Sequence, residues 1–220
     1  MSSSKEEILN KVRAALKDVP DEESTDQPVD RSYRRQSSLA RGELVNMFAE
    51  HVGEYQAWVK IIKPSELAKT IGESCERESV KKLVVPAGIN ENWLPSGRPG
   101  LTILKDEPKP LSHDELDQSD AVLTGCHVAV AQTGTVVLNG GAGQGRRVLT
   151  LLPDFHICVV RAEQIVEIIP EAFSELDQLV RESGPPVTFI SGPSATSDIE
   201  LSRVEGVHGP RRLEVLILEV

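Results

Sequence analysis

Short apolar runs alternate with amphipathic segments along most of this chain, and this alternation restricts the fold more than any other feature. Residues 55–62 alternate as a strand does, residues 64–77 open with a proline near the first helical position, and residues 81–85 form a short apolar run. The order strand, helix, strand is typical of a parallel sheet covered by helices on both faces. The sequence therefore predicts an α/β protein with a mainly parallel sheet.

The same pattern continues toward the C-terminus. A length of 220 residues suits one domain, or one domain with an arm. Further strands are predicted at residues 101–104, 156–160, 187–190 and 213–220, and further helices at residues 38–51 and 170–181 and in a short segment from Ser112.

The first 37 residues differ in composition from the rest of the chain. Residues 1–16 carry apolar side chains at helical spacing and predict an amphipathic helix. Residues 17–37 predict a flexible linker, because residues 17–30 hold six acids and one lysine and include prolines. The α/β domain is predicted at 38–220. An isolated helix of this length is marginal in water, so it should dock on its own domain, on a second copy or on a partner protein.

Composition excludes several classes of protein. A net charge of -10 argues against a nucleic-acid surface. The sequence shows neither a membrane span nor the apolar core of a signal peptide, so we expect a cytoplasmic protein. Cys75, Cys126 and Cys158 lie far apart, and three cysteines cannot supply a four-thiolate iron–sulfur cluster. We expect no metal site and no iron–sulfur cluster in this chain, and the sequence identifies no other cofactor.

Residues 124–152 contain the first candidate site. An apolar run turns at Thr133-Gly134-Thr135 and continues as a second short strand, which predicts a hairpin. A segment rich in glycine, residues 139–145, follows and leads directly into Arg146 and Arg147. Glycines can take positive φ and turn successive N–H groups toward one anion beside the two guanidinium groups. A mobile hairpin loop is the alternative. The spacing fits neither a dinucleotide fingerprint nor a Walker phosphate loop.

Two more segments carry candidate residues. Residues 191–200 place small hydroxyl side chains after a predicted strand, where a helix start could bind a ligand or could simply be capped. His208 lies between glycines in a predicted turn and titrates near neutral pH, although a structural role is equally open. The predicted ligand-binding residues are Thr133, Gly134, Thr135, Gly140, Gly141, Gly143, Gly145, Arg146, Arg147, Ser191, Gly192, Ser194, Thr196, His208 and Arg211.

Three segments together resemble the lactate utilisation protein C family, the LUD-domain proteins. They are TGTVVLNGGAGQGRRVLTLLPDFHICVV, FISGPSATSDIE and GVHGPRRLEVLILE, and they occur in the order of that family. The resemblance covers roughly residues 38–220 and is strongest over residues 122–219.

The resemblance implies a three-layer α/β/α sandwich similar to the sugar-phosphate isomerase and CoA-transferase superfamily. It also implies a role in the oxidation of L-lactate to pyruvate, together with two partner proteins that carry iron–sulfur clusters. Gln132 stands where members of the family often have an acidic residue. Glutamine cannot attack a thioester as a carboxylate does, so the resemblance indicates a pathway rather than an acyl-transfer mechanism.

The leading hypothesis is a component without a cluster in a lactate-oxidising system, with a pocket for a small carboxylate or a phosphate-bearing ligand. Arg146, Arg147 or Arg211 could clamp the carboxylate. The first alternative is a stand-alone sugar-phosphate isomerase or CoA-transferase-like enzyme, for which Asp198, Glu200 and His208 are the candidate bases. The second alternative is an assembly or regulatory module without catalysis. The sequence does not decide whether the chain is an enzyme.

Overall fold

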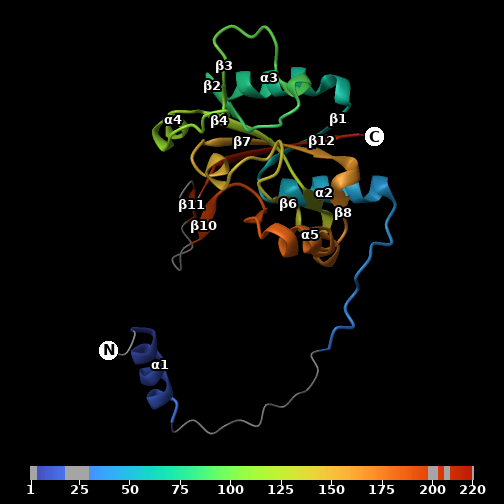
Figure 1. Ribbon diagram of the computed structural model, residues 1–220. Helices are drawn as coiled ribbons and strands as arrows, with labels where there is room; N and C mark the ends of the chain where they lie inside the picture. Colours follow the sequence, from blue (N-terminus) through green and yellow to red (C-terminus); the bar gives the residue numbers. More distant parts are fainter. Residues whose placement is uncertain (1–3, 18–29, 198–202, 206–208, 220) are drawn as a thin grey trace. The chain divides into compact units, whose positions relative to one another are not determined.

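The computed structural model describes residues 4–17, 30–197, 203–205 and 209–219. The chain divides into two compact units, residues 1–34 and residues 35–220. In the first unit α1 spans Ser4–Ala15 (Figure 1). Its apolar side chains Ile8, Leu9 and Val12 are exposed. The division of the chain at residues 16 and 37 stays a prediction, but Ser37 already belongs to the second unit, where its Oγ donates to Glu167.

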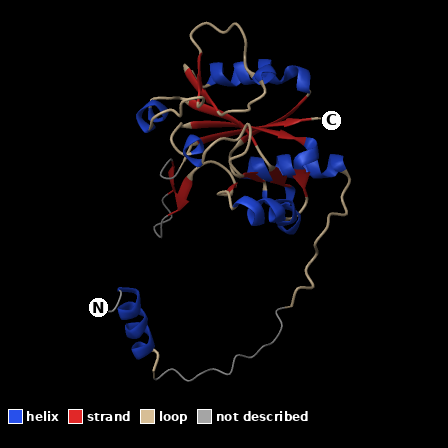
Figure 2. Cartoon of the chain, in the orientation of Figure 1, coloured by secondary structure: helices blue, strands red, loops and turns tan. Residues whose placement is uncertain are grey.

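A six-stranded parallel sheet forms the centre of the second unit (Figure 2), which confirms the predicted parallel arrangement. The spatial order of its strands is β1-β12-β7-β4-β2-β3. Their bounds are Trp58–Ile62 for β1, Lys82–Val85 for β2, Thr102–Lys105 for β3, Ala121–Gly125 for β4, Phe155–Arg161 for β7 and Arg212–Leu218 for β12.

Helices cover both faces of this sheet because side chains alternate between the two faces along each strand. The helix α3, Leu67–Arg77, packs on Ile157, Val159 and the other side chains of one face. The helix α2, Arg41–Glu54, packs on the opposite face, where Cys158 and Val160 point. The short α4, His113–Asp117, begins at the predicted Ser112, whose Oγ accepts from the Glu115 N–H. None of the helices among the described residues is long and apolar enough to cross a bilayer.

A second, smaller sheet lies beyond α2 in the order β8-β5-β6-β9 and was not predicted. The hairpin of β5, Val128–Val130, and β6, Thr135–Leu138, was predicted, and its antiparallel pairing is confirmed. This hairpin forms the middle of the second sheet: β8, Ile165–Val166, pairs with β5, and β9, Thr188–Ile190, pairs antiparallel with β6. The helix α5, Ile169–Ser183, packs its buried Ala172 and Leu176 on the outer face of this sheet.

The predicted helix start after residue 191 is wrong. Residues Ala195–Ser197 form β10, which pairs antiparallel with β11, Arg203–Glu205, because an extended segment satisfies its backbone groups with a neighbouring strand. The strand before it, β9, lies in the small sheet rather than at the carboxyl edge of the parallel sheet. Short 3-10 turns occupy Pro64–Glu66, Glu91–Trp93, Ala131–Thr133, Arg147–Thr150 and Ala162–Gln164.

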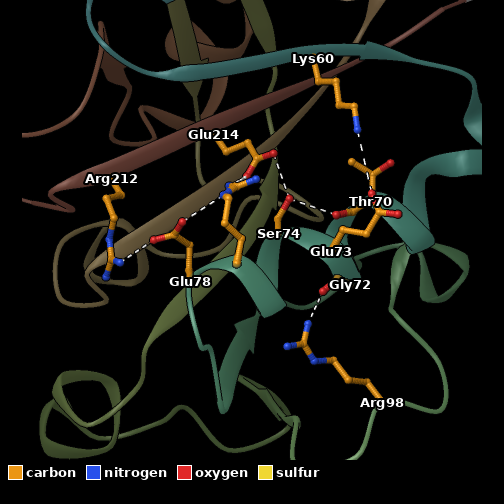
Figure 3. Close-up of polar contacts among 10 residues, drawn as sticks. Lys60, Thr70, Gly72, Glu73, Ser74, Glu78, Arg98, Arg212 and Glu214 are labelled. Carbon is orange, nitrogen blue, oxygen red and sulfur yellow. Dashed lines mark hydrogen bonds and ion pairs between the residues drawn. The ribbon is translucent and has the colours of Figure 1, made fainter.

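The strand β12, second from one edge of the parallel sheet, carries a buried carboxylate. Glu214 is 3% exposed and accepts hydrogen bonds from Ser74 Oγ at 2.9 Å and from Arg77 Nη2 at 2.5 Å. Figure 3 shows how Glu78 extends this network to Arg212, at the start of the same strand. The network therefore joins α3 to β12.

Replacing Glu214 should destabilise the domain more than replacing an exposed acid. In Glu214→Gln one of the two carboxylates that pair with Arg77 loses its charge at a buried position, which should lower the free energy of unfolding by roughly 1–3 kcal/mol in urea titrations. Glu163→Gln is the matched control, because Glu163 pairs with Arg161 at the surface and should contribute under about 1 kcal/mol. Equal losses in the two variants would contradict the structural role of the Glu214 network.

Candidate functional site

The glycine loop, residues 139–145, lies across the carboxyl ends of β2 and β4. The Gly143 N–H donates to the Ala87 carbonyl at 2.7 Å, and the Gly125 N–H donates to the Gly143 carbonyl at 2.8 Å. The predicted positive φ values are present at Gly140, Gly143 and Gly145, at 74°, 73° and 72°. At Gly145 a side chain would also collide, since a Cβ would lie 2.6 Å from Leu149 Cδ1.

Several N–H groups of the glycine loop are already used inside the protein. Asn139 N donates to Gln144 Oε1 at 2.7 Å, Gly141 N donates to Asn139 Oδ1 at 2.9 Å, and both Gln144 and Gly145 donate to the Gly141 carbonyl. The loop is thus held in shape by its own hydrogen bonds. Each of these N–H groups therefore already has an acceptor within the protein.

Arg146 is bound to a carboxylate of the protein. Its Nε and Nη2 donate to the two oxygens of Asp106 at 2.8 Å each, and Nη2 also donates to the Leu111 carbonyl. Burial alone would raise the pKa of Asp106, but the hydrogen bonds from Arg146 and from the Leu111 N–H outweigh it and lower that pKa. Asp106 directly follows β3, so this ion pair fastens the glycine loop to the carboxyl edge of the sheet.

Arg147 has a different environment. It begins the 3-10 turn Arg147–Thr150, and its Nη1 donates to Thr150 Oγ1 at 2.8 Å. Among the residues that the structure describes, no carboxylate lies within ion-pair distance of Arg147. Partial burial lowers the pKa of its guanidinium, which nevertheless stays charged at any physiological pH.

A cavity of about 250 Å³ opens beside Arg147. We call it the Arg147 cavity; besides Arg147, it is lined by Thr150, His156, Phe189, Ile190, Ser191, Gly192, Pro193, Ser194, Gly209, Pro210 and Leu213. His156 and Leu213 are each the second residue of their strands, β7 and β12. The cavity therefore lies near the amino ends of these strands and not at the carboxyl ends, where open α/β sheets commonly bind ligands.

His156 is a buried neutral histidine. It is 1% exposed, and its Nε2 lies 2.8 Å from Thr124 Oγ1 on the adjacent β4. Burial, with a further contribution from the positive charge of Arg147, lowers the pKa of His156 from 6.5 to about 3. The ring therefore carries no charge at neutral pH, and the guanidinium of Arg147 supplies the formal charge of this part of the cavity wall.

Two further cavities adjoin the glycine loop. One of about 280 Å³ shares Arg147 and Thr150 with the first and is also lined by Gly140, Gly145 and Arg146. The other, of about 470 Å³, lies at the carboxyl edge and is lined by Gly140, Gly141, Gly145 and by the paired Asp106 and Arg146. In this second cavity the two charges neutralise each other, so it offers less attraction to an anion than the Arg147 cavity.

The remaining residues of the predicted site are divided among several places. Gly134 packs closely against α2, since a Cβ added at Gly134 would lie 2.7 Å from the His51 carbonyl carbon. Thr135 Oγ1 lies 2.7 Å from Ser191 Oγ, within hydrogen-bond distance. Thr133 Oγ1 bonds Thr135, and Arg211 forms an ion pair with Asp154 at 2.7 Å. Thr196 belongs to β10. The candidate bases Asp198, Glu200 and His208 lie outside the described residues.

The sequence reasoning did not select His156, Thr150, Thr124 or Asp106. His156 had a detectable signal, because it is a titratable side chain in the middle of the apolar run 155–160. Asp106 had none, since only the fold places it beside Arg146. Cys75, Cys126 and Cys158 are free and buried, and the described part of the chain holds no group of three His, Cys, Asp or Glu side chains that could bind a metal ion.

Comparisons with known proteins give a consistent result. The model of the LUD domain family matches residues 45–218. A lactate utilization protein C of Deinococcus radiodurans is 48% identical over 186 residues, which is 84% of each chain. One of Halalkalibacterium halodurans is 31% identical over 190 residues, or 80% of each chain. The crystal structure of a DUF162 family protein from Deinococcus radiodurans is similar with a TM-score of 0.70 and 43% identity, covering 82% of this chain and 99% of that one.

The buried His156 should make the domain sensitive to mild acid. Its pKa of about 3 in the folded state is below its ordinary value of 6.5, so the unfolded chain binds more protons between these pH values. This contribution to stability is complete above pH 6.5 and is lost as the pH falls toward 3. The loss should approach roughly 1 kcal/mol per pH unit.

The measurement compares urea unfolding of the wild type and His156→Gln at several pH values between about 6.5 and 4.5, above the range in which most carboxylates titrate. The wild type should lose stability more steeply than the variant as the pH falls. Parallel curves would show that His156 is not held neutral by the fold.

Proposed function

The chain belongs to the LUD domain family and, within it, to the lactate utilization protein C proteins, as the resemblance predicted. From this premise we propose that it is a component of L-lactate oxidation to pyruvate and that it binds a small carboxylate in the Arg147 cavity. The observation that carries the proposal is the guanidinium of Arg147, which has no carboxylate partner in the described part of the protein. Lactate and pyruvate are both carboxylates, and arginine binds such groups with two parallel hydrogen bonds.

The contrast between the two neighbouring arginines supports Arg147 as the anchor. Arg146 already has a bidentate partner in Asp106, so a ligand would have to compete with an ion pair inside the protein. Among the residues that the structure describes, the guanidinium of Arg147 bonds only to Thr150, whose oxygen atoms are uncharged. A bound carboxylate would therefore supply the charge compensation that the protein leaves out at this position.

The size of the cavity also favours a small ligand. At about 250 Å³ it is near the lower limit of ligand pockets, which suits an acid of a few carbon atoms better than a nucleotide or coenzyme A. Thr150 and Ser191 in its wall carry hydroxyl groups that can hydrogen-bond the ligand. A phosphate-bearing ligand is a second anion that the same guanidinium could bind.

The proposal includes the place of this chain in the cell and its partners. We assign it to the cytoplasm. We also assign it two partner proteins that carry iron–sulfur clusters, because its own three buried cysteines cannot form a four-thiolate cluster. The finer assignment of its fold to the sugar-phosphate isomerase and CoA-transferase-like superfamily is part of the same proposal, supported by the six-stranded parallel sheet with helices on both faces.

Removing the Arg147 side chain should weaken ligand binding and leave the fold intact. We expect Arg147→Ala to weaken binding of pyruvate or lactate by about tenfold to a hundredfold, which corresponds to losing one or two hydrogen bonds to a charged group. Calorimetric titration measures the affinity, and thermal unfolding shows whether the variant folds.

Arg146→Ala is the matched control for this prediction. It breaks the ion pair with the largely buried Asp106, so it should lower the melting temperature and affect ligand affinity less than Arg147→Ala does. If pyruvate, lactate and inorganic phosphate bind the wild type and Arg147→Ala equally, or bind neither, the carboxylate site is excluded.

The exposed apolar stripe of α1 favours a second role, in assembly. Ile8, Leu9, Val12 and Leu16 are between 39% and 62% exposed and recur at helical spacing. A helix of twelve residues with an uncovered apolar side is marginally stable in water and gains stability when a partner covers that side. We infer that α1 contributes to binding of the iron–sulfur partner proteins, alongside ligand binding by the α/β domain.

Deleting residues 1–30 should abolish capture of the iron–sulfur partners in co-expression and affinity pull-down experiments, while carboxylate affinity stays unchanged. The double variant Ile8→Asp/Val12→Asp should have the same effect, because it places charges on the apolar stripe. Lys5→Asp/Lys11→Asp changes charge on the same helix without altering the apolar side chains and should retain capture. Capture that survives the deletion would contradict the assembly role of α1.

A further inference from the structure

His156 has one ring nitrogen bound inside the protein and one that faces the Arg147 cavity. Nε2 is paired with Thr124 Oγ1, while Nδ1 has no partner among the described residues. In that part of the chain every fully buried side-chain nitrogen or oxygen has a hydrogen-bond partner. Nδ1 therefore has access to open space, and the ring lines the Arg147 cavity.

The contact with Thr124 determines which nitrogen of His156 carries the proton. Thr124 is fully buried, and the His156 ring is the hydrogen-bond partner of its hydroxyl in the described structure. If Nε2 carried the proton, the Thr124 hydroxyl would accept it and its own proton would be left without an acceptor, at a cost of roughly 1–3 kcal/mol. The favoured arrangement has the Thr124 O–H donating to Nε2, so the neutral ring carries its proton on Nδ1.

The Arg147 cavity then contains two different donors. The guanidinium of Arg147 is a charged, forked donor suited to the two oxygens of a carboxylate. The Nδ1–H of His156 is a single neutral donor, suited to one uncharged oxygen. Both side chains line the same cavity of about 250 Å³, so the two groups lie near each other.

We propose that His156 is the specificity-determining residue of this cavity and that its Nδ1–H selects carboxylates with an oxygen on the adjacent carbon, that is, 2-oxo and 2-hydroxy acids. This inference rests on the proposed carboxylate site at Arg147. With the carboxylate on Arg147, the oxygen on C2 accepts from Nδ1–H. An acid that lacks this oxygen leaves a buried donor unpaired, and polar sites reject such analogues.

The test compares pyruvate and L-lactate with propionate, which has the same number of carbon atoms but no oxygen on C2. The wild type should bind the first two at least about tenfold more tightly than propionate, as expected for one hydrogen bond to a buried donor. His156→Gln should remove this preference, because a glutamine amide reaches the position of Nε2 and leaves the position of Nδ1 empty. His156→Asn should retain much of it, because its amide nitrogen is bonded to Cγ as Nδ1 is.

A second measurement does not depend on any ligand. Nitrogen NMR of isotope-labelled protein distinguishes protonated from unprotonated ring nitrogens, and His156 should show a protonated Nδ1 and a bare Nε2. Melting temperatures of His156→Gln and His156→Asn identify any variant that fails to fold.

Each outcome supports or overturns one of the two proposals. Equal affinity of the wild type for pyruvate and propionate, with both lost in Arg147→Ala, would overturn the role of His156 and leave the carboxylate site standing. A protonated Nε2 would overturn the role of His156 as well. If none of the three acids binds the wild type, the carboxylate site itself fails and the selectivity fails with it.

Discussion

The placement of β12 between β1 and β7 is the constraint on which the rest of the structure depends. This strand comes last in the chain, yet it pairs on both sides over most of its length and brings Glu214 into the sheet. Glu214 binds Arg77 of α3, and the guanidinium of Arg77 in turn lies 4.1 Å from the ring centre of Trp58 on β1. A single buried charge thus fixes a helix and an edge strand, and the parallel sheet is complete only when the last residues have folded.

The same strand positions the Arg147 cavity. Leu213 lies opposite His156 in the register of β12 and β7, and both line the cavity. Arg146 has extended backbone angles, with φ -69° and ψ 152°, and successive side chains of an extended segment point to opposite sides. This accounts for the different environments of the two adjacent arginines. The Arg146 side chain reaches Asp106 at the carboxyl edge, and the Arg147 side chain reaches the cavity near the amino ends of the strands.

The sequence predicted those features that depend on local patterns. Period-two and helical spacing identified most strands of the parallel sheet, the hairpin and α5, and the glycines with positive φ were identified from residue type alone. Local patterns carry no information about which strands pair, so the place of β12, the second sheet and the pairing of β10 with β11 were missed. For the candidate site, composition indicated an anion near residues 146–147 but could not separate the two arginines, because the partner of Arg146 lies 40 residues away.

The electrostatics of the Arg147 cavity explain why a buried histidine is compatible with the proposed anion site. A charged His156 would add a second cation beside Arg147 and would be costly at 1% exposure, whereas a carboxylate partner for Arg147 would cancel the attraction for a ligand. The fold does neither: Thr124 holds the ring and burial keeps it neutral, while Arg147 is left with neutral protein partners. Binding of an anion to Arg147, as proposed, would therefore stabilise the folded domain.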